Sequence, residues 1–347
     1  MAFNVQQVAG RILNWVGAVL LALPLSSNTF SQEASTVSMN TVEHQQLMQL
    51  LQAIEPYHPR TDVTGTATLA GSTTMTILGQ NWSERFKLFH KDVVFTRGVD
   101  GGDAALRSLA KDPNVIAGIS RSLTDKEIAD LKAGACKDPM IFIVALDPMA
   151  VYVHKDNPLQ SLTPEQMQKL FGAGSDGKPK VSKWGELGVQ GAMAEQPIRI
   201  HHRSSISGTR NFIKTSILGG LELAEPAQTH ESNTNICTAI SKDPNGIAMC
   251  GFGDGNEGVR PLALELNNQR IEANESSFLA GKYPIVRPLS LILDKSLLAK
   301  DNGLREAIIR YILSRDGQLE AIRAGFYPLD PNFLRQEIAQ LTGTQLR

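Results

Sequence analysis

The sequence predicts an α/β protein built from mostly parallel sheets. From Val63 onward, short apolar runs typical of strands alternate with segments whose apolar residues have helical spacing. This alternation favours strands that are joined by helices. Several of the strands end in loops rich in glycine and hydroxyl side chains. The length of 347 residues, of which 42% are hydrophobic and 20% charged, suits a globular protein of about two domains.

Residues 1–34 predict a signal peptide. A start with one cation and no acid precedes a mostly apolar run, Ile12–Leu25. This run is too short for a comfortable bilayer span but fits a signal-peptide core. Small residues suited to cleavage follow, without an Ala-x-Ala site, at Ser26, Ser27, Ser31 and Ala34. We expect an exported, soluble mature protein, periplasmic or secreted; an uncleaved anchor is the alternative.

The next segment, residues 35–60, predicts a short helix followed by a linker. Its apolar residues have helical spacing as far as Ile54, and Pro56 ends the pattern. Beyond it the alternating elements begin. The predicted strands are Val63–Leu69, Val93–Thr96, Val115–Ile119, Ile141–Ala145, Ala150–His154, Ile198–His202, Ile247–Phe252 and Leu289–Leu293. The predicted helices are Met75–Leu88, Ala104–Ala110, Asp125–Ala133, Pro164–Phe171, Thr209–Leu218, Asn235–Lys242, Leu304–Leu313 and Gly317–Ala324.

The three cysteines allow one disulfide in an oxidising compartment. Cys237 opens a predicted helix and Cys250 ends the strand that follows it. An antiparallel helix–strand unit would bring these two ends together, so Cys237–Cys250 is the preferred pair; three buried free thiols are the alternative. No metal site is expected, because Cys-x-x-Cys is absent and the adjacent His201 and His202 would point to opposite faces of a strand.

An anion site is predicted where a helix begins after Arg203-Ser-Ser-Ile-Ser-Gly-Thr209. Free N–H groups at the start of a helix attract anions, and Gly208 lets the backbone approach a ligand. Ser207 and Thr209 add hydroxyl donors, and Arg203 adds a forked cation that suits a tetrahedral oxyanion. A plain helix cap with a surface arginine is the alternative. With a net charge of −1, the anion would be held by local groups, and nucleic-acid binding through a basic face is not expected.

The order of motifs resembles the periplasmic phosphate-binding proteins of ABC transporters, the PstS-like branch of type II periplasmic binding proteins. The motifs are Gly71-Ser-Thr-Thr-Met75, Gly98-Val-Asp-Gly-Gly102, Ala117-Gly-Ile-Ser-Arg121, Leu162-Thr-Pro-Glu-Gln, Lys183-Trp184, Arg203 to Thr209, Pro244-Asn-Gly-Ile-Ala-Met-Cys-Gly-Phe252 and Tyr283-Pro-Ile-Val-Arg-Pro-Leu289. The resemblance implies two lobes, each a mostly parallel sheet flanked by helices, joined by crossing hinge strands. Lobe one would comprise about 61–152 plus 284–347, and lobe two 153–283.

The resemblance also implies the ligand-binding residues. Thr74 and Met75 match the first loop of the family by a hydroxyl and a backbone N–H, and Arg203 matches its arginine. The other donors of the second lobe match Ser207, Gly208 and Thr209.

Two loops depart from the family pattern. Val99 and Asp100 replace serines of the second loop, so Val99 would act only through its backbone. Ser120 and Arg121 stand where some members carry an aspartate that accepts a hydrogen bond from protonated phosphate. Without this acceptor, selection against sulfate would rest on Asp100 or be weaker.

The function implied is the capture of inorganic phosphate between the lobes for uptake through an ABC-transporter permease in the membrane. We expect a monomer that has no cofactor and is not an enzyme. The alternatives are a binding protein or sensor for another oxyanion (sulfate, molybdate or tungstate), a secreted phosphatase, and a structural or adhesive protein that kept the fold without the ligand.

Overall fold

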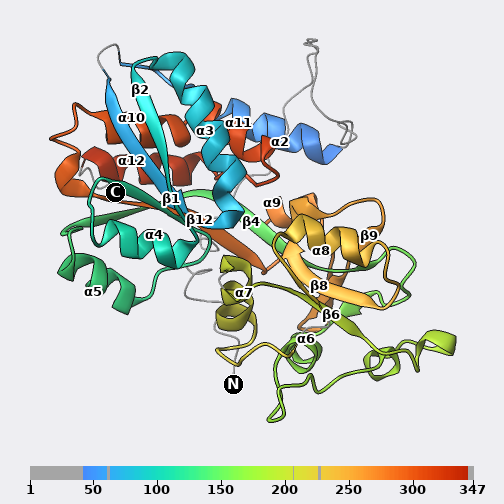
Figure 1. The fold of residues 1–347 in the computed structure, drawn as a ribbon. Coiled ribbons are helices and arrows are strands. Elements are labelled where there is room, and N and C mark those ends of the chain that lie inside the picture. The colour runs from blue at the N-terminus through green and yellow to red at the C-terminus, as the bar shows by residue number, and fades with distance from the viewer. Residues whose placement is uncertain (1–41, 61–62, 206, 226–227, 343–347) are drawn as a thin grey trace.

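The computed structural model describes residues 42–60, 63–205, 207–225 and 228–342 (Figure 1). Within these ranges one sheet runs through the whole molecule in the order β2-β1-β3-β12-β4-β8-β6-β7, and β9 pairs with β4. Its strands are β1 (Gly65–Gly71), β2 (Val93–Asp100), β3 (Val115–Ile119), β4 (Pro139–His154), β6 (Arg199–Arg203), β7 (Gln228–His230), β8 (Gly246–Gly251), β9 (Val259–Pro261) and β12 (Val286–Asp294).

Parallel strands occupy the two ends of this sheet, and antiparallel strands connect them. β1 pairs in parallel with β2 and β3, and β6 pairs in parallel with β7 and β8. β12 is antiparallel to β3 and to β4, and β4 is antiparallel to β8. Strand β4 alone is long enough to pair with both halves, so it forms the main connection between them (Figure 1).

Helices cover both faces of the sheet in the first half. They are α2 (Val42–Gln52), α3 (Thr76–Phe89), α4 (Gly102–Leu109), α5 (Asp125–Ala133), α10 (Leu304–Ile312), α11 (Arg315–Arg323) and α12 (Pro331–Thr342). Helix α3 buries Leu78, Trp82 and Phe86, which share one face at a spacing of four residues. On β3, Ile116 packs into the core beneath α3, whereas Ala117 packs into the core beneath α4, because successive side chains of a strand point to opposite faces.

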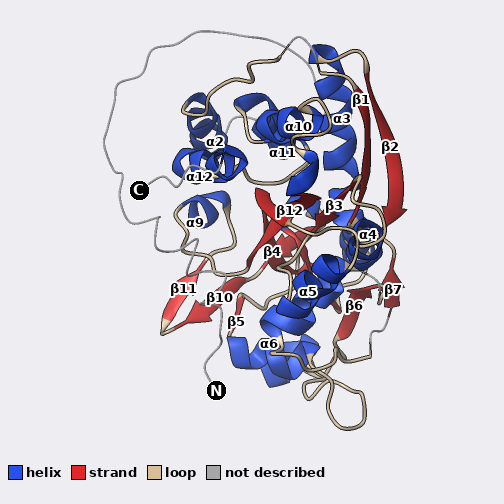
Figure 2. Ribbon diagram, turned by 90° about the vertical axis from the view of Figure 1, so that its left-hand side faces the viewer, coloured by secondary structure: helices blue, strands red, loops and turns tan. Residues whose placement is uncertain are grey.

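The second half contains shorter elements (Figure 2). Its helices are α6 (Pro164–Phe171), α7 (Gly208–Phe212), α8 (Asn233–Ile240) and α9 (Glu275–Leu279), and its small second sheet comprises β5 (Ser161–Leu162), β10 (Ala263–Leu266) and β11 (Gln269–Ile271). Helix α6 starts at a capping box in which Thr163 and Gln166 satisfy each other's backbone N–H groups. Helix α7 continues as a π-helix over Ile213–Ile217.

Separate hydrophobic cores, one in lobe two and two in lobe one, define the lobes. Lobe two is built around a core that contains most of the buried apolar residues between Met149 and Ile285, together with Leu47 and Tyr327. The cores of lobe one draw on residues 51–145 and 289–334. The chain therefore passes from the cores of one lobe to the core of the other near 145–149 and 285–289, where β4 and β12 cross. The sequence-based boundaries at 152/153 and 283/284 stay predictions.

The prediction of an α/β fold with two lobes is confirmed, and most predicted elements lie within a few residues of the observed ones. The strands predicted at Ile141–Ala145 and Ala150–His154 are one strand, because Pro148 continues the pairing with β12 opposite Val286 instead of ending it. Helix α12 and the short strands β7 and β9 were not predicted. Residues 1–34, the predicted signal peptide, lie outside the described residues. None of the helices in the described ranges has the length and apolar character needed to cross a bilayer.

Candidate anion site between the lobes

The lobe-one side of the candidate site is the turn that follows β1. Ser72 caps a single 3₁₀ turn, Thr73–Met75, by accepting a hydrogen bond from the backbone N–H of Thr74 at 3.3 Å. Its hydroxyl is also 2.9 Å from the hydroxyl of Ser120, which follows β3. Because β1 and β3 are parallel neighbours, their carboxyl ends bring these two loops together, as expected for a binding site in an open α/β sheet.

The lobe-two side is the segment between β6 and α7. Ser207 caps α7 by accepting from the backbone N–H of Thr209 at 3.1 Å, so the predicted helix start at Ser207-Gly208-Thr209 is confirmed. Gly208 faces lobe one closely: a Cβ atom on it would lie well below 3.0 Å from the Ser120 hydroxyl and 3.3 Å from that of Ser72. The lobes are thus in contact here, and glycine is the residue that permits it.

Arg203 connects the two lobes. It is 5% exposed, donates from Nη2 to the Thr73 hydroxyl at 3.2 Å and donates from Nη1 to Asn233 Oδ1 at 3.2 Å. Its Nε is buried without a hydrogen-bond partner. Burial and the nearby positive charge of Arg287 lower the pKa of Arg203 from its usual value. A cation in this position is stabilised further by an anion.

A second buried arginine, Arg287, was not predicted. It lies on β12, donates from Nε to Asp147 Oδ2 at 2.8 Å and donates from Nη2 to the Thr74 hydroxyl at 3.3 Å. The signal that could have found it is an arginine inside an apolar strand, Tyr283-Pro-Ile-Val-Arg-Pro-Leu289, because a cation there needs partners.

Two buried carboxylates accompany the arginines. Asp254 accepts hydrogen bonds from Asn233 Nδ2 at 3.0 Å and from the Thr234 hydroxyl at 3.1 Å. Burial raises the pKa of Asp254 above its usual value, against the opposing effect of these hydrogen bonds and of the nearby arginines. Burial also raises the pKa of Asp147, although Arg287 opposes this shift. Both acids therefore interact with the buried arginines at this junction.

Three of the buried donors that lack a partner belong to residues of this junction. Arg203 Nε, Arg287 Nη1 and Thr209 Oγ1 are buried and have no hydrogen-bond partner. Leaving a buried donor unpaired costs about 1–3 kcal/mol, and more for a charged group. Such a set is expected where a ligand supplies the missing acceptors.

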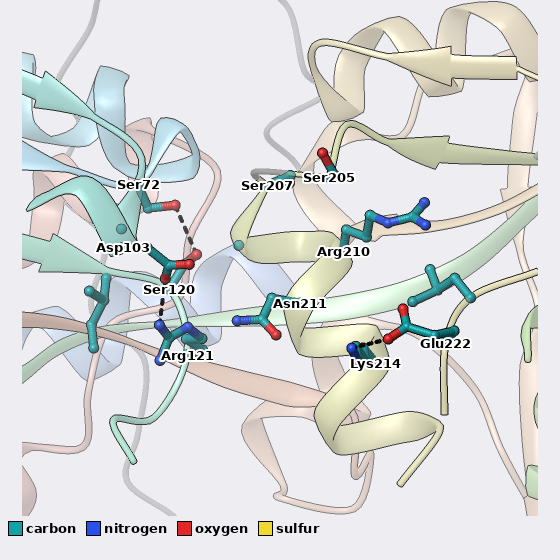
Figure 3. A pocket seen from close by; sticks show the side chains of 14 residues that line it. Ser72, Asp103, Ser120, Arg121, Ser205, Ser207, Arg210, Asn211, Lys214 and Glu222 are labelled. Carbon is teal, nitrogen blue, oxygen red and sulfur yellow. Dashed lines mark hydrogen bonds and ion pairs between the residues drawn. The ribbon is translucent and has the colours of Figure 1, made fainter. Parts of the chain in front are cut away.

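A cavity of about 280 Å³ lies outside the contact between Gly208 and Ser120 (Figure 3). Lobe one contributes Ser72, Asp103, Ser120 and Arg121 to it, and lobe two contributes Ser207, Arg210, Asn211 and Lys214, among others. Figure 3 shows these two groups on opposite sides of the cavity. We call this cavity, which is open to the surface, the vestibule; Arg203, Thr209 and Arg287 are not among the residues that line it.

Arg121 lines the vestibule but its charge is already paired. Nη2 donates to Asp103 Oδ1 at 2.6 Å and to Glu127 Oε1 at 2.5 Å. These carboxylates raise the pKa of Arg121 even though burial lowers it. The two acids neutralise the positive charge of Arg121.

The structure does not bring Val99 and Asp100 to the cavity. The side chain of Val99 is 47% exposed, and Asp100 pairs with Arg97 at 2.7 Å on the exposed end of β2. The neighbouring Gly102 and Asp103 line the cavity instead. Edge strand β2 directs the two side chains to solvent, and a contribution of Val99 and Asp100 to ligand binding stays a prediction.

The predicted cysteine pair is brought together. Cys237 on α8 and Cys250 on β8 are both buried, with their Sγ atoms 3.4 Å apart and both thiols free. Their disulfide stays a prediction. Within the described ranges, no three His, Cys, Asp or Glu side chains are grouped so as to hold a metal ion.

The chain belongs to the PBP superfamily, whose domain model matches residues 57–316. Its lobes have the fold of the type II periplasmic binding proteins. One relative is the phosphate-binding protein PstS of Pseudomonas aeruginosa, 28% identical over 295 residues, which covers 83% of this chain and 91% of the relative. Protein SphX of Synechococcus elongatus is 26% identical over 271 residues, covering 76% and 77%.

Solved structures show the same fold. A putative phosphate ABC transporter substrate-binding protein with bound phosphate from Clostridium perfringens has a TM-score of 0.62 at 22% identity, covering 76% of this chain and all of that one. An ABC-type phosphate transport receptor from Vibrio cholerae has a TM-score of 0.61 at 21% identity, with coverage of 76% and 100%.

Proposed function

We propose that this chain binds inorganic phosphate between its lobes and delivers it to the permease of an ABC transporter. The observation that carries the proposal is a pair of buried, unpaired donors at the junction, Arg203 Nε and Thr209 Oγ1, on an arginine and a helix start that face lobe one; Arg203 itself donates to Thr73 there. A relative that aligns over 91% of its own length is named a phosphate-binding protein, which supports phosphate as the ligand.

The binding residues of this proposal are those that lie at the junction or beside it. Thr74 and Met75 supply a hydroxyl and a backbone N–H from the turn after β1, and Ser120 supplies a hydroxyl. Ser207, Gly208 and Thr209 supply donors from the start of α7, and Arg203 supplies the cation. Arg121 supports the vestibule by holding Asp103 and Glu127.

Binding and closure are coupled in this scheme. Only the closed arrangement offers an anion the donors of both lobes at once, so the anion stabilises that arrangement. A dehydrated dianion held in this way would bind with a free energy on the order of −8 kcal/mol, which is micromolar affinity. This task requires neither a nucleophile nor a general base, so we infer binding rather than catalysis.

The cellular setting follows from the same proposal. A chain that feeds a permease must lie outside the cytoplasm, which agrees with residues 1–34 acting as a signal peptide. We infer a periplasmic protein that acts as a monomer, since the two half-sites come from one chain.

Titration calorimetry with phosphate, sulfate and molybdate tests the proposal. Phosphate is expected to bind, and Arg203→Ala is expected to weaken it by about 2–5 kcal/mol, because a desolvated anion loses its opposite charge. Arg199→Ala is the matched control: Arg199 lies on the same strand, is half exposed and pairs with Asp243. Binding of sulfate without any response to phosphate would favour the oxyanion alternative and refute this one.

A further inference from the structure

We propose that Arg287, on the crossing strand β12, is a second anion-binding cation of the cleft, so that the ligand contacts the hinge strands as well as the two lobes. This inference rests on the proposed function and extends its site by one residue. It comes from the position of Arg287, its burial and its unused donors.

Arg287 lies at the crossing of the hinge strands. It is opposite Asp147 in the antiparallel register of β12 and β4, close to where the core contacts pass from one lobe to the other. Its guanidinium carbon is 5.9 Å from the ring centre of Phe212 in lobe two, and its Nη2 reaches Thr74 in lobe one. Arg287 thus contacts both lobes and the hinge.

The two arginines approach the same turn from different elements. Arg203 donates to the Thr73 hydroxyl at 3.2 Å, and Arg287 donates to the Thr74 hydroxyl at 3.3 Å. These threonines are consecutive residues of the turn after β1. Two guanidinium groups thus lie beside the same turn, an arrangement that suits a tetrahedral anion with two charges.

The hydrogen bonds of Arg287 leave one nitrogen for a ligand. Arg287 is 0% exposed, and Asp147 Oδ2 binds its Nε at 2.8 Å and its Nη2 at 2.7 Å. Nη1, which carries two N–H donors, has no partner. Asp147 fixes the guanidinium plane, so Nη1 is held in place for an acceptor that the protein itself does not provide.

A purely structural arginine elsewhere in the chain offers a comparison. Arg305 is 2% exposed and pairs with Asp301 at 2.7 Å through Nη1, while its Nη2 donates to the Asn114 carbonyl at 2.8 Å. Both terminal nitrogens of Arg305 are therefore used within the fold, and only its Nε is buried without a partner. Arg287 differs because its outer nitrogen is unused.

Titration calorimetry with inorganic phosphate distinguishes a ligand-binding role of Arg287 from a purely structural one. Arg287→Lys keeps the charge but loses the fork, and the double variant Asp147→Asn with Arg287→Gln removes both charges of the buried pair. Both are expected to bind phosphate at least about 30-fold more weakly than the wild type. Arg305→Lys is the matched control and is expected to keep wild-type affinity.

The double variant decides the matter, because it leaves no unpaired buried charge. If it melts cooperatively and binds phosphate within about threefold of the wild type, Arg287 is only structural and the inference is overturned. A crystal structure of the wild type with phosphate gives a second test that needs no variant: Nη1 is expected at about 3 Å from a phosphate oxygen. A separation beyond hydrogen-bond range would overturn the inference. If the wild type binds no phosphate at all, the proposed function fails first.

Discussion

A single substitution at the contact between Gly208 and Ser120 is expected to weaken closure of the two lobes. In Gly208→Ala, the new Cβ would overlap the Ser120 hydroxyl and touch that of Ser72 at 3.3 Å. Both hydroxyls belong to lobe one, whereas Gly208 belongs to lobe two, so the overlap exists only when the lobes are closed. We expect the substitution to destabilise the closed arrangement and to leave each lobe intact.

The size of the effect follows from what must move. Ser120 can rotate away, but it then loses its 2.9 Å hydrogen bond to Ser72, which contributes about 1 kcal/mol. Forcing an extra methyl group into a packed contact costs about 1–3 kcal/mol. Since the anion requires closure, its affinity should fall by the same amount, which corresponds to about 5- to 150-fold.

Titration calorimetry with phosphate measures the loss of affinity, and thermal unfolding in the absence of anion measures whether the lobes stay intact. Gly208→Ala should bind more weakly while its unfolding temperature without anion stays near that of the wild type. Gly79→Ala is the control, because Gly79 lies within α3 and a Cβ there meets nothing within 4 Å. Wild-type affinity in Gly208→Ala would refute the reasoning, since it would mean that the lobes do not close onto this contact.

Two further predictions concern stability and the thiols. Burial lowers the pKa of His202 to about 3, so below pH 6.5 the unfolded chain takes up a proton that the folded chain does not. The free energy of unfolding should therefore fall as the pH drops from 6.5 towards 3, by up to ~1.4 kcal/mol per pH unit. Chemical denaturation of His202→Leu should show a flatter pH profile over this range. An unchanged profile would contradict the assignment. Because Cys237 and Cys250 are adjacent, thiol titration of unfolded protein isolated from an oxidising compartment should find one thiol, that of Cys136, whereas a count of three would exclude the disulfide.

Local chemistry carried much of the fold prediction. The apolar periods, the caps and the glycine-rich turns predict most of the helices and strands, because these signals act over a few residues. Helix α5 (Asp125–Ala133) and strand β3 (Val115–Ile119) have the predicted bounds. β7 was missed because Gln228–His230 has no apolar pattern, and it is a strand only because β6 lies beside it.

The sequence by itself determined the start of α7 and the identity of Arg203 as the cation beside it, since caps and glycine-rich loops depend on near neighbours. Only the tertiary structure decided which charged side chains remain unpaired and available to bind an anion. Arg121 is neutralised by Asp103, 18 residues away in the chain, and Asp100 points to solvent at the sheet edge. Arg287 reaches the turn at Thr74 across 213 residues. Pairings of this length arise from how the strands are ordered in the sheet, and no local pattern encodes that order.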